Sequence, residues 1–331
     1  MHDGDAALSR KRRHSSALRG FIRGVFQFGG EALIDGVLLL DKPSGKSTSF
    51  CARLLGKACK CKAGHAGTLD PFATGLVTVL LGSATKLSPF LTNFDKTYTG
   101  EVRLGVKTST GDCEGEVIEE CADLPSEAEI REIVGSLLGR VELMVPAFSA
   151  VKKDGKRLYK YARDGHSVEL PRRTVEIATL DIDDVHLPRF RFTATVSKGT
   201  YIRALAEKIG EMAGCGAHLT ELRRVRVGNF RIETALPMHI AMELAESGKL
   251  CGKVLSPADA LPFPEVELSR DTAREIALGR FPKLDVDNLA DGDIFYVSYS
   301  TKLIAILRKQ HNNGTAFEFI RVFVRPDEIE N

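Results

Sequence analysis

The chain has 331 residues, of which 43% are hydrophobic and 27% are charged, and this composition is typical of a globular protein with a substantial core. Its 46 basic and 44 acidic residues leave a formal net charge of +2, so a surface that binds nucleic acid must be a local patch. No stretch approaches the roughly eighteen apolar residues that a membrane-spanning helix needs, so we expect no association with a membrane.

The first 34 residues differ in composition from the rest of the chain. Arg10-Lys11-Arg12-Arg13, Arg19 and Arg23 lie among serine and glycine, and no acidic residue occurs between positions 6 and 30. Such a basic, polar segment predicts a flexible N-terminal extension over residues 1–34.

Seven cysteines are scattered along the chain without a repeated Cys-x-x-Cys spacing. This distribution favours reduced thiols and a cytoplasmic location over a disulfide framework. Cys59 and Cys61 are separated by one residue, which is the wrong spacing for a zinc site, so we expect no metal centre.

Hydrophobic periodicity and capping residues predict alternating strands and helices over residues 35–253, which we expect to form the main domain. In chain order, these elements are a buried strand over 36–40, a helix capped by Ser47 or Thr48, a strand from Tyr98 to Val106, a helix that Ser126 and Glu129 cap and Gly139 ends, a strand over 190–196 and a helix that begins at Tyr201.

The proline-rich stretch 261–264 marks a change of pattern. A short helix near 271–278 is followed by three apolar, strand-like runs over 294–297, 303–307 and 317–324, with Asn313-Gly314 as a hairpin signal. We therefore expect a second, small β-rich domain over residues 254–331.

The segment from Gly64 to Gly75 places one carboxylate, Asp70, on a shaped loop. Pro71 disfavours a helical conformation for Asp70, and the flanking glycines permit positive φ or close backbone approach. Catalytic side chains concentrate on such loops, although Thr-x-Asp-Pro is also an ordinary turn sequence. Asp70 is our candidate nucleophile.

A second segment, from Asp41 to Ser47, ends in Gly-Lys-Ser like a phosphate-binding P-loop. The first glycine of that pattern is missing, because Leu40 occupies its position, and Pro43 removes an amide that would face a phosphate. A P-loop nucleotide hydrolase is therefore the weaker interpretation.

Several separated motifs resemble the TruB-type tRNA pseudouridine synthases, in order and in spacing. They are Gly36-x4-Asp41-Lys42-Pro43-x-Gly45, Gly64-His65-x-Gly67-Thr68-Leu69-Asp70-Pro71-x-Ala73-Thr74-Gly75, Lys96-x-Tyr98, Thr108-x-Thr110-x-Asp112-x-x-Gly115, the stretch from Pro146 to Gly165, Tyr201-Ile202-Arg203 and His218-Leu219-x-x-Leu222-Arg223-Arg224. The resemblance covers residues 36–240, whereas the tail resembles the family's PUA-like domain only loosely.

The resemblance implies an α/β (α+β) fold with a mixed, largely antiparallel sheet flanked by helices, followed by a small PUA-like β domain. It also implies isomerisation of uridine to pseudouridine in RNA without a cofactor. Asp70 is then the nucleophile, Arg203 favours its charged form, and Tyr98 stacks on the uracil. Attack at C1′, attack at C6 and prior loss of the base all remain open as routes.

By the same resemblance, further residues bind the substrate. His65 is the wedge that replaces the flipped uridine in the RNA stack, and Tyr201 and Leu222 close the pocket. Basic side chains are expected to contact the RNA, namely Lys42, Lys96, Lys152, Arg223 and Arg224. Asp112 is interpreted as part of a structured turn.

The expected partner is tRNA, bound through its T-arm and modified at uridine 55 (tRNA numbering), by a monomer that needs no guide RNA. Two alternatives from other classes are an RNA-folding chaperone and the P-loop hydrolase. The presence of Asp70, Tyr98 and Arg203 argues against the first, and the missing glycine argues against the second.

Overall fold

The computed structural model describes residues 26–28, 31–153, 155–164, 166, 168–312 and 315–329. Most of the basic extension predicted over 1–34 lies outside these residues, apart from the short antiparallel pair β1 (Phe26–Phe28) and β2 (Glu31–Leu33). Within the described part of the chain, no helix is long and apolar enough to span a membrane.

A mixed sheet of ten strands forms the centre of the molecule, in the order β16-β3-β5-β14-β6-β13-β12-β9, with β4 and β15 paired to β5 and β14. Only the β16–β3 and β5–β14 pairs are parallel, which confirms the predicted mixed, largely antiparallel sheet. The strands are β3 (Gly36–Lys42), β4 (Ala63–Ala66), β5 (Thr74–Leu81), β6 (Lys96–Leu104), β9 (Gly139–Met144), β12 (Arg172–His186), β13 (Arg189–Val196), β14 (Ala217–Val227), β15 (Phe230–Arg231) and β16 (Leu236–Pro237).

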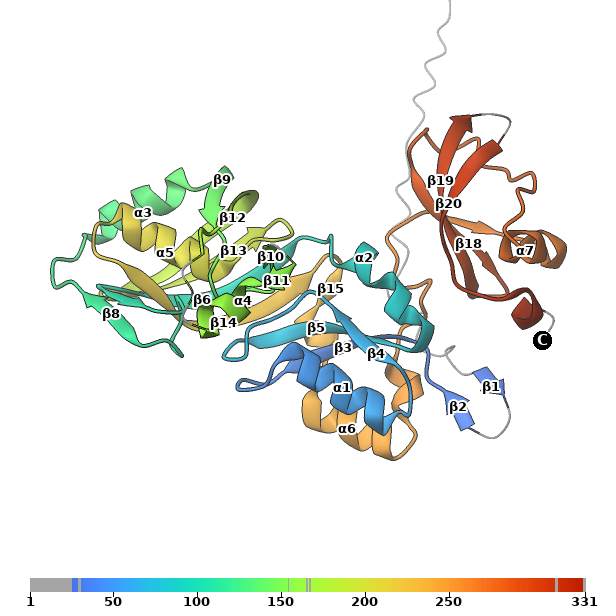
Figure 1. Cartoon of the computed structure of the whole chain (residues 1–331), viewed down its shortest axis with the longest axis horizontal. Coiled ribbons are helices and arrows are strands. Elements are labelled where there is room, and N and C mark those ends of the chain that lie inside the picture. Colours follow the sequence, from blue (N-terminus) through green and yellow to red (C-terminus); the bar gives the residue numbers. More distant parts are fainter. Residues whose placement is uncertain are drawn as a thin grey trace, which may run out of the picture.

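Four helices share a hydrophobic core with one face of this sheet: α1 (Thr48–Ala58), α3 (Glu127–Ser136), α5 (Ile202–Met212) and α6 (Met238–Glu246). Helices α1 and α6 contact each other, as do α3 and α5 at the other end of the sheet (Figure 1). Ser47 caps α1, and Ser126 with Glu129 forms the predicted capping box of α3. Helix α3 ends at Ser136, before the predicted Gly139, because Gly139 already begins β9 with φ +86°.

Shorter elements connect these layers. They are η1 (Gly82–Leu87), α2 (Ser88–Leu91), the pairs β7 (Val106–Thr108) with β8 (Val117–Glu120) and β10 (Lys152–Lys153) with β11 (Lys156–Arg157), α4 (Leu158–Arg163), η2 (Ile232–Thr234) and η3 (Leu250–Lys253).

The C-terminal part has its own four-stranded sheet, β17 (Glu265–Glu267), β18 (Ile294–Tyr299), β19 (Lys302–Asn312) and β20 (Thr315–Val322), with α7 (Arg270–Ala277) and η4 (Pro326–Ile329). The predicted helix and three strands are thus present, whereas the expected turn at 313–314 lies outside the described residues. A second core joins this sheet to the other face of the large sheet, and Lys86 Nζ donates to Phe323 O at 3.1 Å. The domain boundaries at 34 and 253 stay predictions.

Candidate active site

The loop between β4 and β5 lies where two parallel strands meet, because β5 pairs with β14 in a register that places Gly75 opposite Arg224. Gly75 has φ +107°, and a Cβ there would lie 2.3 Å from the carbonyl oxygen of Arg224. Gly67, at the other end of the loop, has φ +89°. Both glycines are therefore required by backbone conformation, and Gly75 also by close approach.

Residues 44–48 hold this loop from one side. The Thr48 hydroxyl donates to Leu69 O and accepts from Leu69 N, both at 2.9 Å, beside Asp70. Gly45 N donates to Pro71 O at 2.8 Å, and Ser44 Oγ donates to Phe72 O at 2.8 Å. The segment that resembles a P-loop thus binds the backbone of the candidate catalytic loop.

Asp70 and Arg203 form a bidentate ion pair. Arg203 lies in the first turn of α5, directly after β13 and its connecting turn, and its Nε and Nη2 donate to the two Asp70 oxygens at 3.0 and 3.2 Å. The Asp70 side chain is 29% exposed, whereas that of Arg203 is 3% exposed. The Asp70 carboxylate is therefore held by a buried guanidinium and remains partly accessible to solvent. A nucleophile must be accessible in this way to reach a substrate.

Arg203 is fixed by three further oxygens. Its Nη1 donates to Thr110 O at 2.8 Å and its Nη2 to Phe148 O at 3.0 Å. The buried carboxylate of Asp112 lies 3.6 Å from Nε, and its other oxygen accepts from Glu114 N at 3.1 Å. Asp112 lies in the structured turn that the sequence predicts. The sequence pattern does not show that this turn carries a second carboxylate to Arg203.

Three basic residues that we expect to contact RNA are buried, and two of them bind the backbone of the loop. Lys42 is fully buried, and its Nζ donates to Pro43 O, Lys46 O and Pro71 O at 2.8, 2.7 and 3.1 Å. Arg224 is fully buried and donates to the carbonyls of Leu76, Thr68 and Gly67 at 2.7, 3.3 and 3.2 Å. Lys96 Nζ donates to Thr92 O and Phe94 O at 2.9 and 2.5 Å.

These contacts correct the expected orientation of Lys42, Lys96 and Arg224, because their donors serve backbone carbonyls and the side chains do not face solvent. Burial lowers the pKa of Lys42, and it lowers the pKa of Lys96 to about 8 with a further contribution from Arg224. The residue type alone predicts a positive charge at these positions. The direction in which each side chain points depends on the tertiary structure, which the residue type does not reveal.

Tyr98 and Leu222 line the region next to the loop. Tyr98 lies opposite Arg224 in the β6–β14 register, and Leu222 lies opposite Gly100. Both side chains are nearly buried, at 6% exposure, and belong to the same apolar cluster as Leu69, which precedes Asp70. Their role toward a nucleobase stays a prediction.

His65 and Tyr201 are half-buried. The Nε2 atom of His65 lies 3.0 Å from Ser49 Oγ, and its Nδ1 is buried without a hydrogen-bond partner among the described residues. Burial and the nearby Arg224 lower the pKa of His65, so the ring is neutral at neutral pH. Tyr201 is the N-terminal cap residue of α5, and burial raises its pKa.

Arg223 and Lys152 are the two predicted RNA contacts that reach the surface. Arg223 donates to both oxygens of Asp41, at 3.1 and 2.8 Å, and keeps 40% of its side chain exposed. Lys152 is exposed in the short β10–β11 pair.

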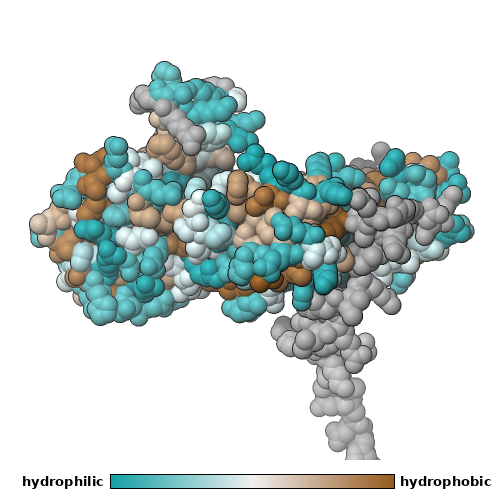
Figure 2. Space-filling model, turned by 90° about the horizontal axis from the view of Figure 1, so that it is seen from below, coloured by the Kyte–Doolittle hydropathy of each residue, from teal (hydrophilic) through white to brown (hydrophobic). Residues whose placement is uncertain are grey.

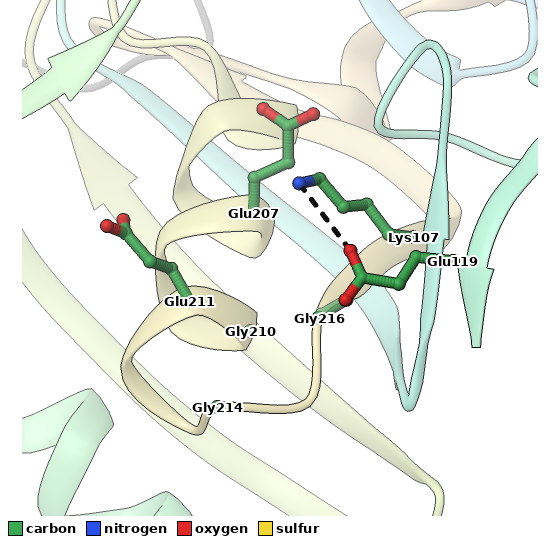
Figure 3. A pocket seen from close by; sticks show the side chains of 8 residues that line it. Lys107, Glu119, Glu207, Gly210, Glu211, Gly214 and Gly216 are labelled. Atoms are coloured by element: carbon green, nitrogen blue, oxygen red, sulfur yellow. Dashed lines mark ion pairs between the residues drawn. The ribbon is translucent and has the colours of Figure 1, made fainter. Parts of the chain in front are cut away.

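A separate cavity of about 210 Å³ lies along α5, lined by Glu207, Glu211, Glu119 and Lys107 (Figure 3). Its carboxylates outnumber its one lysine, so it would repel a phosphate. Burial raises the pKa of Glu207. On the face drawn in Figure 2, hydrophilic residues are interspersed with smaller apolar areas.

Two family models match the chain. The N-terminal domain model of the TruB family of pseudouridylate synthases matches residues 53–202, and the C-terminal domain model of tRNA pseudouridylate synthase B matches residues 203–261. The tRNA pseudouridine synthase B of Aromatoleum aromaticum is 44% identical over 254 residues, which are 75% of this chain and 81% of that protein. The protein of the same name from Geobacter sulfurreducens is 43% identical over 231 residues, 69% of this chain and 76% of that protein.

Among solved structures, a Cbf5-Nop10-Gar1 complex contains a similar chain, with a TM-score of 0.69 and 24% identity over 89% of this chain and 86% of that one. An H/ACA ribonucleoprotein bound to a substrate RNA containing 2′-deoxyuridine matches with a TM-score of 0.67 and 23% identity, over 88% and 86% of the two chains. These two likenesses establish the fold.

Proposed function

The chain belongs to the TruB family of pseudouridylate synthases, and from this premise we propose that it converts uridine 55 in the T loop of tRNA to pseudouridine. The reaction breaks the bond between N1 of the uracil and C1′ of the ribose, and joins C5 to C1′. C5 loses its proton and N1 gains one, so the product is an isomer of the substrate. The bidentate pair of Asp70 and Arg203 is the observation that carries this proposal.

Each neighbouring side chain then has a role. Asp70 is the nucleophile, and Arg203 orients its carboxylate through two hydrogen bonds. Tyr98 stacks on the uracil, and Leu222 and Tyr201 close the pocket around it. The neutral ring of His65 takes the place of the flipped base in the stack, which a charged ring would do at a greater desolvation cost.

We divide the basic residues into two groups. Lys42 and Arg224 support the catalytic loop from within, and Asp112 supports Arg203. Lys96 binds the carbonyls of Thr92 and Phe94, just before β6. Lys152 and Arg223 contact the RNA backbone. The enzyme acts in the cytoplasm as a monomer without a guide RNA, and its main and C-terminal domains meet near residue 253.

An unmodified tRNA transcript and an Asp70→Asn variant test this function. We expect the wild type to form pseudouridine at position 55, and the isosteric variant to bind the transcript without forming product. Asp287→Asn, a change at an exposed aspartate, is the matched control and should retain activity. Turnover by Asp70→Asn would remove Asp70 from its role, and a wild type that modifies no uridine would refute the proposed function.

A further inference from the structure

Two cysteines lie on either side of a tight turn at the end of α1. Cys59 caps the helix, Lys60 N donates to Lys57 O at 3.2 Å, and Cys61 N donates back to Gly56 O at 2.9 Å. This pair of bonds is a Schellman motif, in which the residue at the reversal adopts positive φ. That residue is Lys60, with φ +50°, rather than the usual glycine.

The turn places Cys59 and Cys61 on the same reversal of the chain with one residue between them, and their thiols share a hydrogen bond. A hydrogen bond between them lowers the pKa of Cys61 to about 7, with a further contribution from the Gly82 N–H, against the opposing effects of burial and Asp35. The same hydrogen bond and burial raise the pKa of Cys59. Both residues are only half-buried, so a small reagent can approach them.

We propose that Cys59 and Cys61 form a reactive dithiol that a peroxide oxidises to an intramolecular disulfide. The Cys61 thiolate attacks one peroxide oxygen and the O–O bond breaks, which gives a sulfenic acid and, from hydrogen peroxide, hydroxide. The Cys59 sulfur then attacks the Cys61 sulfur, the S–OH bond breaks, and water leaves. The proton of Cys59 leaves with the S–OH oxygen as water, and the hydroxide of the first step takes up the proton that Cys61 lost when it ionised. Each sulfur gives up one electron, so the two thiols together reduce one hydrogen peroxide to two waters.

The site lies close to the proposed catalytic loop along the chain. Strand β4 begins at Ala63, two residues after Cys61, and carries His65. A Cβ at Gly56 would lie 2.6 Å from Ala63 Cβ and 3.0 Å from Cys61 O, so the turn packs tightly against α1. Within the described part of the chain, no group of three metal-ligating side chains occurs, which favours redox chemistry over metal binding at this pair.

Peptide mapping of the full-length protein tests the proposal. Reduced protein is treated with hydrogen peroxide at pH 7, its remaining thiols are alkylated, and it is digested with trypsin without reduction. Cleavage after Lys60 separates the two cysteines, so a disulfide appears as a covalent link between peptides 58–60 and 61–62. We expect this link in the wild type and its disappearance after treatment with dithiothreitol.

Two variants make the result specific. In Cys59→Ser, Cys61 should stop at a sulfenic acid that dimedone traps, whereas Cys113→Ser, a change at an exposed cysteine, should leave the link intact. In the untreated wild type, Cys61 should react with iodoacetamide about fivefold faster than Cys113 at pH 7, because its larger thiolate fraction outweighs its lower nucleophilicity. The proposal would be overturned if both cysteines remained fully alkylable after peroxide treatment. It would also be overturned if Cys61 were oxidised to a sulfinic acid and no linked peptides formed.

Discussion

At the scale of single residues, Arg203 is held by more contacts than an ion pair with Asp70 needs. Its guanidinium binds Asp70 through two nitrogens, reaches two backbone carbonyls, and lies beside Asp112. A planar fork can satisfy all of these oxygens at once, whereas a lysine ammonium is a single point of charge. Its geometry, and not only its charge, orients the Asp70 carboxylate.

We therefore expect Arg203→Lys to lower the single-turnover rate of pseudouridine formation by about 100-fold, or about 2.7 kcal/mol in the barrier. The matched control is Arg131→Lys, which changes an exposed ion pair with Glu127 on α3 and should leave the rate unchanged. Quench-flow measurement with excess enzyme isolates the chemical step. A rate within twofold of the wild type would show that positive charge alone suffices.

The lowered pKa of Lys96 predicts that the free energy of unfolding depends on pH. Its pKa is about 8 in the folded protein, because it is buried, and about 10.4 in an unfolded chain. Between these values the unfolded state binds more protons, so the free energy of unfolding rises with pH. Below pH 8 the cost of burying the charged amine is fully present. The neutral amine keeps two N–H groups, enough for Thr92 O and Phe94 O.

Relative to Lys96→Met, the wild type should gain about 1.5 kcal/mol in unfolding free energy between pH 8 and pH 9.5, measured by urea denaturation. The corresponding difference between wild type and Lys160→Met, a change at an exposed lysine, should stay constant with pH. A wild type that instead loses stability relative to Lys96→Met over this range would contradict the assignment.

At the scale of elements, the junction of β5 and β14 positions the loop. Gly75→Ala would force a Cβ to within 2.3 Å of Arg224 O at φ +107°, so we expect a loss of about 3 kcal/mol in unfolding free energy. Gly135→Ala, at an exposed position of α3 where a Cβ would have no neighbour within 4 Å, should instead stabilise by about 0.5 kcal/mol. Thermal unfolding of both variants measures the contrast, and equal melting temperatures would argue against a strained junction.

The strands differ in how well the sequence predicts them. Strands β6 and β13 were predicted because their apolar residues alternate along one covered face. Strand β14 was not predicted, because it is central in the sheet and buries the polar residues His218 and Arg224. Each is satisfied by distant carbonyls, His218 Nδ1 lying 2.8 Å from Val106 O, and no local pattern encodes such partners.

The candidate site divides in the same way. The motifs predicted that Asp70 and Arg203 meet across 133 positions of sequence, and they do. They could not predict that Lys42 and Arg224 turn inward, because the carbonyls that hold them belong to a loop whose conformation depends on the complete sheet.

At the scale of the whole molecule, one sheet unites the segments that the two family models divide. The models meet between residues 202 and 203, in the first turn of α5, and β14 from the second lies between β5 and β6 from the first. The two family models therefore divide the sequence but not the folded domain, since both parts contribute to the same sheet and the same core.

The chain has a formal net charge of only +2, so RNA affinity should depend on individual exposed cations. We expect binding of tRNA to weaken steeply with salt, and Lys152→Gln to reduce the slope of log K against log salt by about 0.7 to 0.9. The neighbouring Lys153 already pairs with Glu169, so Lys153→Gln should change the slope less. Filter binding from low to physiological salt measures both, and a flat response of the wild type would refute the electrostatic contribution.

The buried clamp of Lys42, Thr48 and Arg224 leaves the acidic loop little freedom to adjust when a polynucleotide arrives. Adaptation must then come from the nucleic acid, which has to unstack its own base at a cost of a few kcal/mol. The turnover rate should consequently depend on how easily the T loop of the RNA unstacks. Transcripts with a destabilised T loop should react faster than the wild-type transcript, and transcripts with a stabilised T loop should react more slowly.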